Sequence, residues 1–119
     1  MLRTLEGHSY WVKSVTVTPD GKRAVSASSD RTLKVWDLES GRTLGTLEGH
    51  SDGVNGVALT ADGKRVVSAS WDSTLKVWDL ETGVCVATFR CDAPVECCAC
   101  AHDIFVAGDE GGRVHFLRL

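Results

Sequence analysis

The chain has 119 residues, and its 13 Lys and Arg are balanced by 16 Asp and Glu, which argues against the clustered basic surface of a nucleic-acid-binding protein. The same balance argues against attachment to an anionic membrane, and no apolar run approaches the roughly 18–20 residues that span a bilayer. Frequent glycine, scarce proline and short apolar runs are typical of short strands joined by tight turns, so we expect an all-β fold.

Four strands are predicted in the first unit of the sequence. The first covers 11–18, and "PDGK" at 19–22 then forms a turn, because proline presets φ and glycine tolerates positive φ. The second, at 23–28, is small and apolar, as in a strand that is buried on both faces. The third, at 32–38, alternates between two faces, and the fourth covers 42–48. No segment has a helical period, so the unit is predicted to be an antiparallel meander.

The same pattern returns 42 positions later. "TLKVWDL" at 32–38 recurs at 74–80, and "TLEGHS" at 4–9 recurs at 46–51. A constant offset indicates tandem duplication of one structural unit. The strands of the second unit are expected at 54–60, 65–70, 74–80 and 84–89. Because one small sheet cannot bury both of its faces, we expect the repeated sheets to stack face to face around an axis.

Strand parity brings particular side chains together in each unit. The link into the first strand and the link between the second and third strands lie at the same end of the sheet. His8 lies in the first of these links and Asp30 in the second, while Ser26 is on the second strand and Trp36 on the third. These four side chains can satisfy one another's donors and acceptors, whereas an unsatisfied partner costs about 1–3 kcal/mol. The second unit repeats the arrangement with His50, Ser68, Asp72 and Trp78.

The succession of Gly-His, Asp and Trp-Asp at a spacing near 42 resembles the tryptophan–aspartate (WD) repeat β-propeller family. The likeness covers nearly the whole chain and is nearest to bacterial propellers with nearly identical blades, which are often attached to signalling ATPases or kinases. It implies about three blades, each a four-stranded antiparallel meander. It also implies two structural tetrads, with Ser28 and Ser70 as near neighbours of the assigned serines. The tetrads are His8, Ser26, Asp30 and Trp36, and His50, Ser68, Asp72 and Trp78.

The third unit departs from this pattern. Gly111 stands at the aspartate position, Leu117 at the tryptophan position and Ala107 at the serine position, and "CD" at 91–92 replaces Gly-His. Because every polar member is lost together, we expect a plain apolar sheet in a degenerate final blade. Its strands are predicted at 95–101, 104–108 and 113–119. Bacterial relatives often end with a similar blade, which implies a natural C-terminal end.

The repeat divides the chain into an orphan outer strand at 2–6, blade one at 7–48, blade two at 49–89 and the degenerate blade three at 91–119. Three blades are too few for a ring, because propellers typically hold 4–8. We therefore expect the ring to be closed by oligomerisation, with each orphan strand completing the last blade of another copy. A dimer with six blades is favoured over a trimer with nine. The alternative is that the chain is a fragment of a longer propeller.

No catalytic, metal or cofactor site is predicted. A Ser26–His8–Asp30 triad is conceivable, but the same constellation occurs twice and suits the structural network better.

The cysteines lack paired C-x-x-C spacing and are interpreted as buried thiols rather than metal ligands. Their odd number makes a poor disulfide framework, and no secretory segment is evident, so we expect a cytoplasmic location. The candidates considered for metal were Cys91, Cys97, Cys98, Cys100 and His102, with Cys85 as the fifth cysteine.

Aromatic residues at positions that differ between the units suggest a partner-binding surface. Tyr10 and Trp11 begin the first strand, and Trp71 occupies a turn where the first unit has Ser29. All three are expected at the end of the sheets that carries the histidines and aspartates; packing against a neighbouring blade is the alternative. The predicted function is a non-catalytic protein-interaction scaffold of a bacterial signalling-type protein. The alternative is a self-assembling propeller fragment whose main activity is ring closure with copies of itself.

Overall fold

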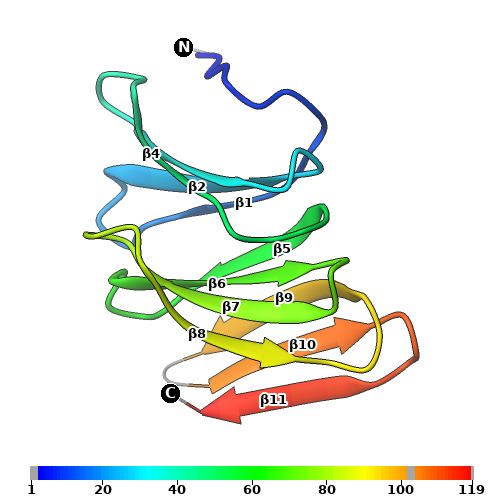
Figure 1. Ribbon diagram of the computed structural model, residues 1–119. Helices are drawn as coiled ribbons and strands as arrows, with labels where there is room; N and C mark the ends of the chain where they lie inside the picture. The colour runs from blue at the N-terminus through cyan, green and yellow to red at the C-terminus, as the bar shows by residue number, and fades with distance from the viewer. Residues whose placement is uncertain (1–2, 102–103, 119) are drawn as a thin grey trace.

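The structure, a computed structural model, describes residues 3–101 and 104–118, and its regular elements in those ranges are all strands (Figure 1). They are β1 (Val12–Val17), β2 (Arg23–Ser28), β3 (Leu33–Asp37), β4 (Thr43–Leu47), β5 (Val54–Leu59), β6 (Arg65–Ser70), β7 (Thr74–Asp79), β8 (Cys85–Arg90), β9 (Val95–Ala101), β10 (Ile104–Asp109) and β11 (Val114–Arg118). This confirms the all-β prediction. The part of the chain that the structure describes holds no helix that could cross a membrane.

The strands form three antiparallel sheets, which follow one another along the chain. Blade one is β1-β2-β3-β4, blade two is β5-β6-β7-β8, and blade three is β9-β10-β11 within the described residues. The sheets stack face to face, with blade two in the middle (Figure 1). The first strand of blade two, β5, contacts the first strands β1 and β9 of its neighbours, whereas β4 and β8 are at the opposite edges of their sheets.

The turns follow the chemistry that the sequence predicts. Between β1 and β2, the Asp20 carboxylate accepts hydrogen bonds from Thr18 Oγ1 at 2.6 Å and from the Lys22 backbone N–H at 2.9 Å. Gly21 adopts a φ of 71°, in the left-handed region where a side chain is disfavoured. Asp62 makes the equivalent bonds in blade two. Local side-chain bonding of this kind gives the two blades the same hairpin geometry.

Two apolar clusters hold the stack together, one at each contact between blades. The first cluster joins blade one to blade two and consists of Val25, Ala27, Leu33, Val35, Leu47, Val54, Val57, Val66, Trp78 and Leu80. The second joins blade two to blade three and consists of Ala58, Val67, Ala69, Leu75, Val77, Val95, Phe105 and Ala107. Each blade therefore gives one face to each neighbour, and blade two, which has two neighbours, is buried on both.

The predicted orphan strand at 2–6 has no strand pairing over residues 3–6. Blade one is already complete with four strands, and the open β11 edge of blade three lies at the opposite end of the stack (Figure 1). Its role as an outer strand and the predicted blade boundaries stay predictions. Leu2, residues 102–103 and Leu119 lie outside the described residues.

Candidate functional site

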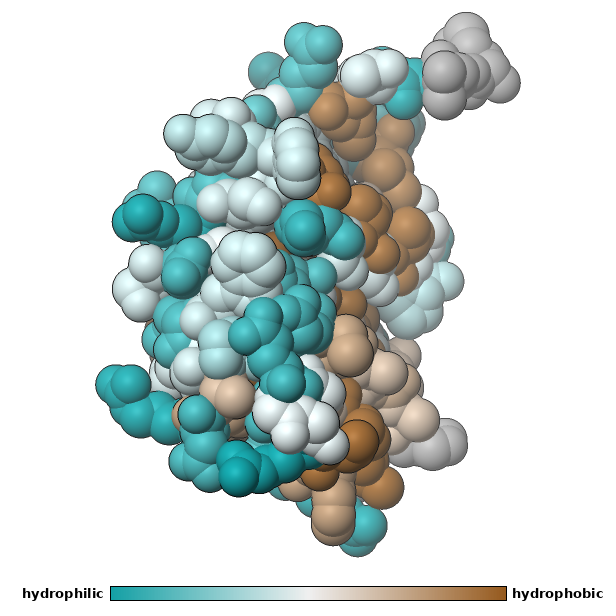
Figure 2. Space-filling view, turned by 90° about the vertical axis from the view of Figure 1, so that its right-hand side faces the viewer, coloured by the Kyte–Doolittle hydropathy of each residue, from teal (hydrophilic) through white to brown (hydrophobic). Residues whose placement is uncertain are grey.

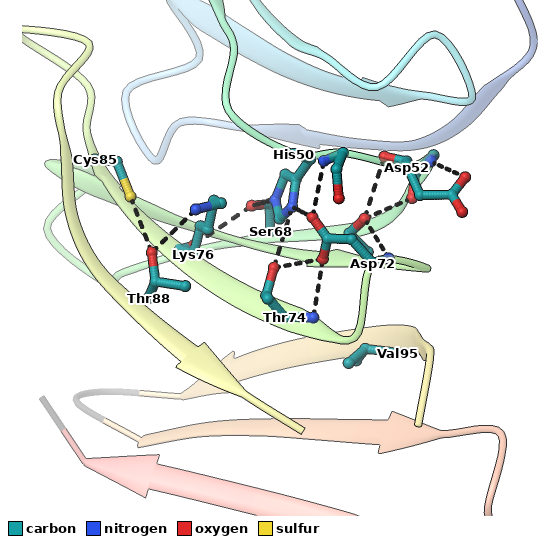
Figure 3. Close-up of polar contacts among 12 residues, drawn as sticks. His50, Asp52, Ser68, Asp72, Thr74, Lys76, Cys85, Thr88 and Val95 are labelled. Carbon is teal, nitrogen blue, oxygen red and sulfur yellow. Dashed lines mark hydrogen bonds and ion pairs between the residues drawn. The ribbon is translucent and has the colours of Figure 1, made fainter. Parts of the chain in front are cut away.

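The buried polar network of blade two connects β6 and β7 with the loop before β5 and the turn between β6 and β7 (Figure 3). His50 Nδ1 lies 2.8 Å from Asp72 Oδ2, and His50 Nε2 lies 2.6 Å from Ser68 Oγ. The indole N–H of Trp78 donates to Ser68 Oγ at 2.9 Å. Ser68 is fully buried and Trp78 nearly so. The structure thus brings together all four residues that the sequence assigned to one tetrad.

Blade one contains the same arrangement. His8 lies 2.8 Å from Asp30 and 2.6 Å from Ser26 Oγ, and the Trp36 N–H donates to Ser26 Oγ at 2.8 Å. Ser28, the alternative considered from the sequence, instead accepts the backbone N–H of Asp30 at 3.0 Å. The serine bonded to the histidine and the indole is therefore Ser26, and Ser28 supports the turn that carries the aspartate.

Hydrogen-bond roles in the tetrad follow from what each group can donate. The Asp72 carboxylate only accepts, so His50 Nδ1 carries the proton that lies between them. In a neutral imidazole Nε2 then accepts, and the Ser68 hydroxyl donates to it while accepting the Trp78 N–H. The resulting relay from indole to hydroxyl to imidazole to carboxylate satisfies every side chain in it. Among the described residues no buried side-chain nitrogen or oxygen lacks a partner.

Electrostatics agree with a neutral histidine bonded to an ionised aspartate. Burial lowers the pKa of His50 below its ordinary value, although the hydrogen bond and charge of Asp72 oppose that shift. Burial alone would raise the pKa of Asp30, but hydrogen bonds from Thr32, His8 and Ser9 outweigh it and hold the pKa at about 2. The pKa of Asp72 is also lowered, since bonds from Thr74 and His50 outweigh burial. The tetrad is therefore built around carboxylates that stay charged at neutral pH.

This geometry is unsuited to nucleophilic catalysis. A nucleophilic serine must reach a substrate and needs an oxyanion hole beside it. Ser68 is 0 % exposed and Ser26 is 5 % exposed, and each already accepts an indole N–H. In blades one and two the tetrads instead tie the loop before the first strand to the second and third strands.

Blade three is not the plain apolar sheet that the sequence predicted. Asp109, at the end of β10, bonds His115 Nε2 on β11 at 2.7 Å through Oδ2, and its Oδ1 accepts the Arg113 backbone N–H at 3.0 Å. These bonds lower the pKa of Asp109. The prediction was wrong because it compared blade three only with the tetrad positions. The available signal was a carboxylate and an imidazole flanking the short turn "EGGR" between two predicted strands.

The aromatic residues predicted as a partner-binding surface are all exposed, and two of them, Trp11 and Trp71, share Lys13 as a neighbour. Tyr10, Trp11 and Trp71 are 70, 79 and 45 % exposed. The Lys13 ammonium, which the sequence did not single out, lies 6.0 Å from the Trp11 ring centroid and 5.9 Å from that of Trp71. The Trp71 indole N–H also donates to Glu96 Oε1 on blade three at 3.1 Å. Trp71 therefore both contacts a neighbouring blade and presents part of its ring to solvent.

The cysteine-rich strand β9 has one exposed cysteine, Cys97, and two partly buried ones, Cys98 and Cys100. Cys98 is packed against the second apolar cluster, and burial raises its pKa to about 12. Cys97, on the opposite face, is exposed, so the expectation of uniformly buried thiols was wrong for this residue. No group of three metal-ligating side chains occurs within residues 3–101 and 104–118. His102, one of the candidates considered for metal, lies outside those ranges.

Comparison with protein families gives matches to two family models. The one described as the TEP-1 C-terminal beta-propeller matches residues 50–119, which is more than half of the chain. The one described as the WD domain, G-beta repeat, matches residues 1–37.

Individual relatives match over about one repeat. The small ribosomal subunit protein RACK1 of Candida albicans is 54 % identical over 41 residues, which are 34 % of this chain and 13 % of that protein. The nuclear distribution protein PAC1 of the same yeast is 53 % identical over 38 residues, 32 % of this chain and 8 % of that protein. Human pleiotropic regulator 1 is 43 % identical over 42 residues, 35 % of this chain and 8 % of that protein.

Proposed function

The chain belongs to the WD-repeat β-propeller family, and from this premise we propose that it serves as a non-catalytic scaffold for binding other proteins. The tetrads support this proposal, because their polar groups are bonded to one another inside blades one and two. Function is then left to side chains on the surface of the blades.

The observation that carries the proposal is the exposure of Tyr10, Trp11 and Trp71 at the tetrad end of the blades. Large aromatic side chains are enriched among the residues that dominate protein–protein binding energy. These apolar rings are unfavourable in water. A partner that covers them removes their apolar surface from water and packs against the exposed ring faces. We call Tyr10, Trp11 and Trp71 the rim aromatics.

The chain covers 8–13 % of the length of the relatives described above. Their full activities therefore do not carry over to it, and the proposal is limited to protein binding. Those relatives come from a yeast and from human, so they lend no support to the bacterial signalling setting expected from the sequence. A cytoplasmic location is part of the proposal, because free thiols such as that of Cys97 suit a reducing compartment.

Replacing the rim tryptophans tests the scaffold proposal. We expect Trp71→Ser and Trp11→Gly to change the free energy of unfolding by less than about 1 kcal/mol each, because both side chains are exposed and lose only surface contacts. These are the Lys13 cation–π contacts and one hydrogen bond. We expect the double variant to lose the proteins that the wild-type chain retains in a pull-down, identified by mass spectrometry.

Val84→Ser is the matched control, since Val84 is exposed but lies beside β8 at the outer edge of blade two. Retention of the same proteins by the double variant would refute the role of the rim aromatics. A large fall in the melting temperature of Trp71→Ser would instead favour packing against blade three as the main role of Trp71.

Self-association is the second candidate function, and it is favoured by the open faces at the two ends of the stack. Three sheets per chain give six in a dimer, within the usual range of propellers, and nine in a trimer. We expect static light scattering to report a discrete multiple of 12.8 kDa, with the dimer favoured. For a dimer with a micromolar Kd, the test has to reach a chain concentration about 100 times that Kd. A monodisperse particle of one chain at every concentration up to that limit contradicts self-association.

A further inference from the structure

The lower face of blade three, turned away from blade two, repeats a buried face of the other blades but is itself uncovered. The equivalent residues in blade two are at most 3 % exposed: Val67, Leu75 and Val77. Their counterparts in blade three are 39, 72 and 80 % exposed: Val106, Val114 and Phe116. We call these three residues the blade-three face. In blade two the same positions pack against the next blade in the chain.

The upper face of blade one, turned away from blade two, is also uncovered. It corresponds to the face of blade two that packs against blade one. Val54 and Val57 of blade two are 0 and 6 % exposed, because they pack against blade one. Their counterparts Val12 and Val15 are 51 and 58 % exposed. They line a groove of about 550 Å³ together with Ala24, Trp36 and Leu5. We call Val12 and Val15, with this groove, the blade-one face.

Figure 2 shows hydrophobic side chains gathered at the upper right, over blade one, and again at the lower right, over blade three. The two faces therefore lie at opposite ends of the stack, and three blades do not bring them together within one chain (Figure 1). Each is one half of a contact that the molecule makes twice internally, between blades one and two and between blades two and three.

The N-terminal segment already follows the course of a preceding blade. Leu5 Cδ2 lies 3.3 Å from the point where Gly41 would carry a Cβ, as Leu47 Cδ2 lies 3.5 Å from the equivalent point on Gly83. Gly7 meets the Trp36 ring as the equivalent glycine of blade two meets Trp78. Residues 3–7 therefore hold the position against blade one that the end of β4 holds against blade two, although they pair with no strand of the described chain.

We propose that a second copy of the chain docks its blade-three face on the blade-one face, by the same contact that joins consecutive blades. This rests on the self-association proposed above and specifies its surfaces. The contact is head-to-tail, so each copy uses two different faces. Residues 3–5 of one copy then lie beside Val114–Phe116 of the other, where β4 lies beside β3 in blade one.

Blocking one face at a time tests the proposal. Val15→Glu blocks the blade-one face and Phe116→Glu blocks the blade-three face; both positions are exposed, so both variants are expected to fold. We expect each variant alone to run as a single chain of 12.8 kDa in sedimentation velocity. An equimolar mixture should form a two-chain particle, because each variant retains the face that the other lacks. One contact holds this pair, so it should dissociate at least 10-fold more readily than the wild-type assembly.

Val84→Glu is the matched control, because it adds the same charge at an exposed valine outside both faces and should assemble as the wild type does. If circular dichroism shows that either variant is unfolded, Val12→Glu and Val114→Glu replace them on the same two faces. A Val15→Glu variant that assembles like the wild type overturns the head-to-tail contact and indicates pairing of like faces. A wild-type chain that stays single overturns both this contact and self-association, whereas the scaffold proposal is decided separately by the rim aromatics.

Discussion

Asp72→Ala is expected to lower the free energy of unfolding by about 3–5 kcal/mol, because a buried donor left without its acceptor costs about 1–3 kcal/mol and several donors lose theirs at once. Four donors converge on this carboxylate: His50 Nδ1, the Ser51 and Thr74 backbone N–H groups and the Thr74 hydroxyl. Alanine leaves all four without their acceptor in a site where the His50 side chain is fully buried. Urea denaturation followed by tryptophan fluorescence measures the change.

Asp92→Ala is the control for removing a carboxylate from a surface ion pair. The Asp92 side chain is 85 % exposed and lies 3.2 Å from Arg113, so we expect a change below about 0.5 kcal/mol. Asp72→Asn should be intermediate, because its amide oxygen still accepts while its NH₂ group opposes the His50 N–H. An Asp72→Ala loss as small as that of Asp92→Ala would show that the tetrad does not stabilise the blade.

Acid is expected to destabilise the protein in two successive pH windows. The pKa of His50 is lowered from 6.5, so its stabilising effect is complete above pH 6.5 and is lost as the pH falls below that value, when the unfolded chain binds the proton first. The pKa of Asp30 is lowered from 3.8 to about 2, so its contribution is complete above pH 3.8 and is lost as the pH falls towards 2. Unfolding free energies from urea titrations between pH 2 and about 8 measure both windows.

The double variant Asp30→Asn, Asp72→Asn separates the tetrad from other titrating groups. Neither asparagine ionises, so the decline below pH 3.8 should become shallower in this variant. It should not vanish, because hydrogen bonds also lower the pKa of turn aspartates such as Asp20. A wild-type protein whose stability rises on acidification from pH 7 to 5 would contradict the neutral, buried state assigned to His50.

Much of the molecule follows from local sequence. The 42-residue repeat, the alternation of side chains and the Asp-Gly turns predict the strands to within a residue or two, because hydrogen bonding and periodicity act over a few neighbouring positions. Strand parity also predicts which end of each sheet holds the histidine and the aspartate, and the structure brings His50 and Asp72 into contact there.

Two contacts could not be predicted from the repeat, one between blades and one within blade three. The Lys13 ammonium lies between Trp11 and Trp71 only because blades one and two stand side by side. In blade three, Asp109 on β10 bonds His115 on β11 in place of a tetrad. Neither residue stands at a tetrad position of the repeat, so the repeat does not predict this contact. Both involve residues at positions where the units differ, so the repeat gives no template for them.

By itself the sequence determined the repeating unit, its strands and the tetrad side chains that meet inside blades one and two, because these depend on spacing along the chain. Only the tertiary structure decided which faces are covered. Val15 and Val57 occupy the same position in successive units, yet the first is 58 % exposed and the second 6 %. Burial depends on what lies on the other side of a sheet, and for Val57 that neighbour is blade one, whereas for Val15 the described chain supplies none.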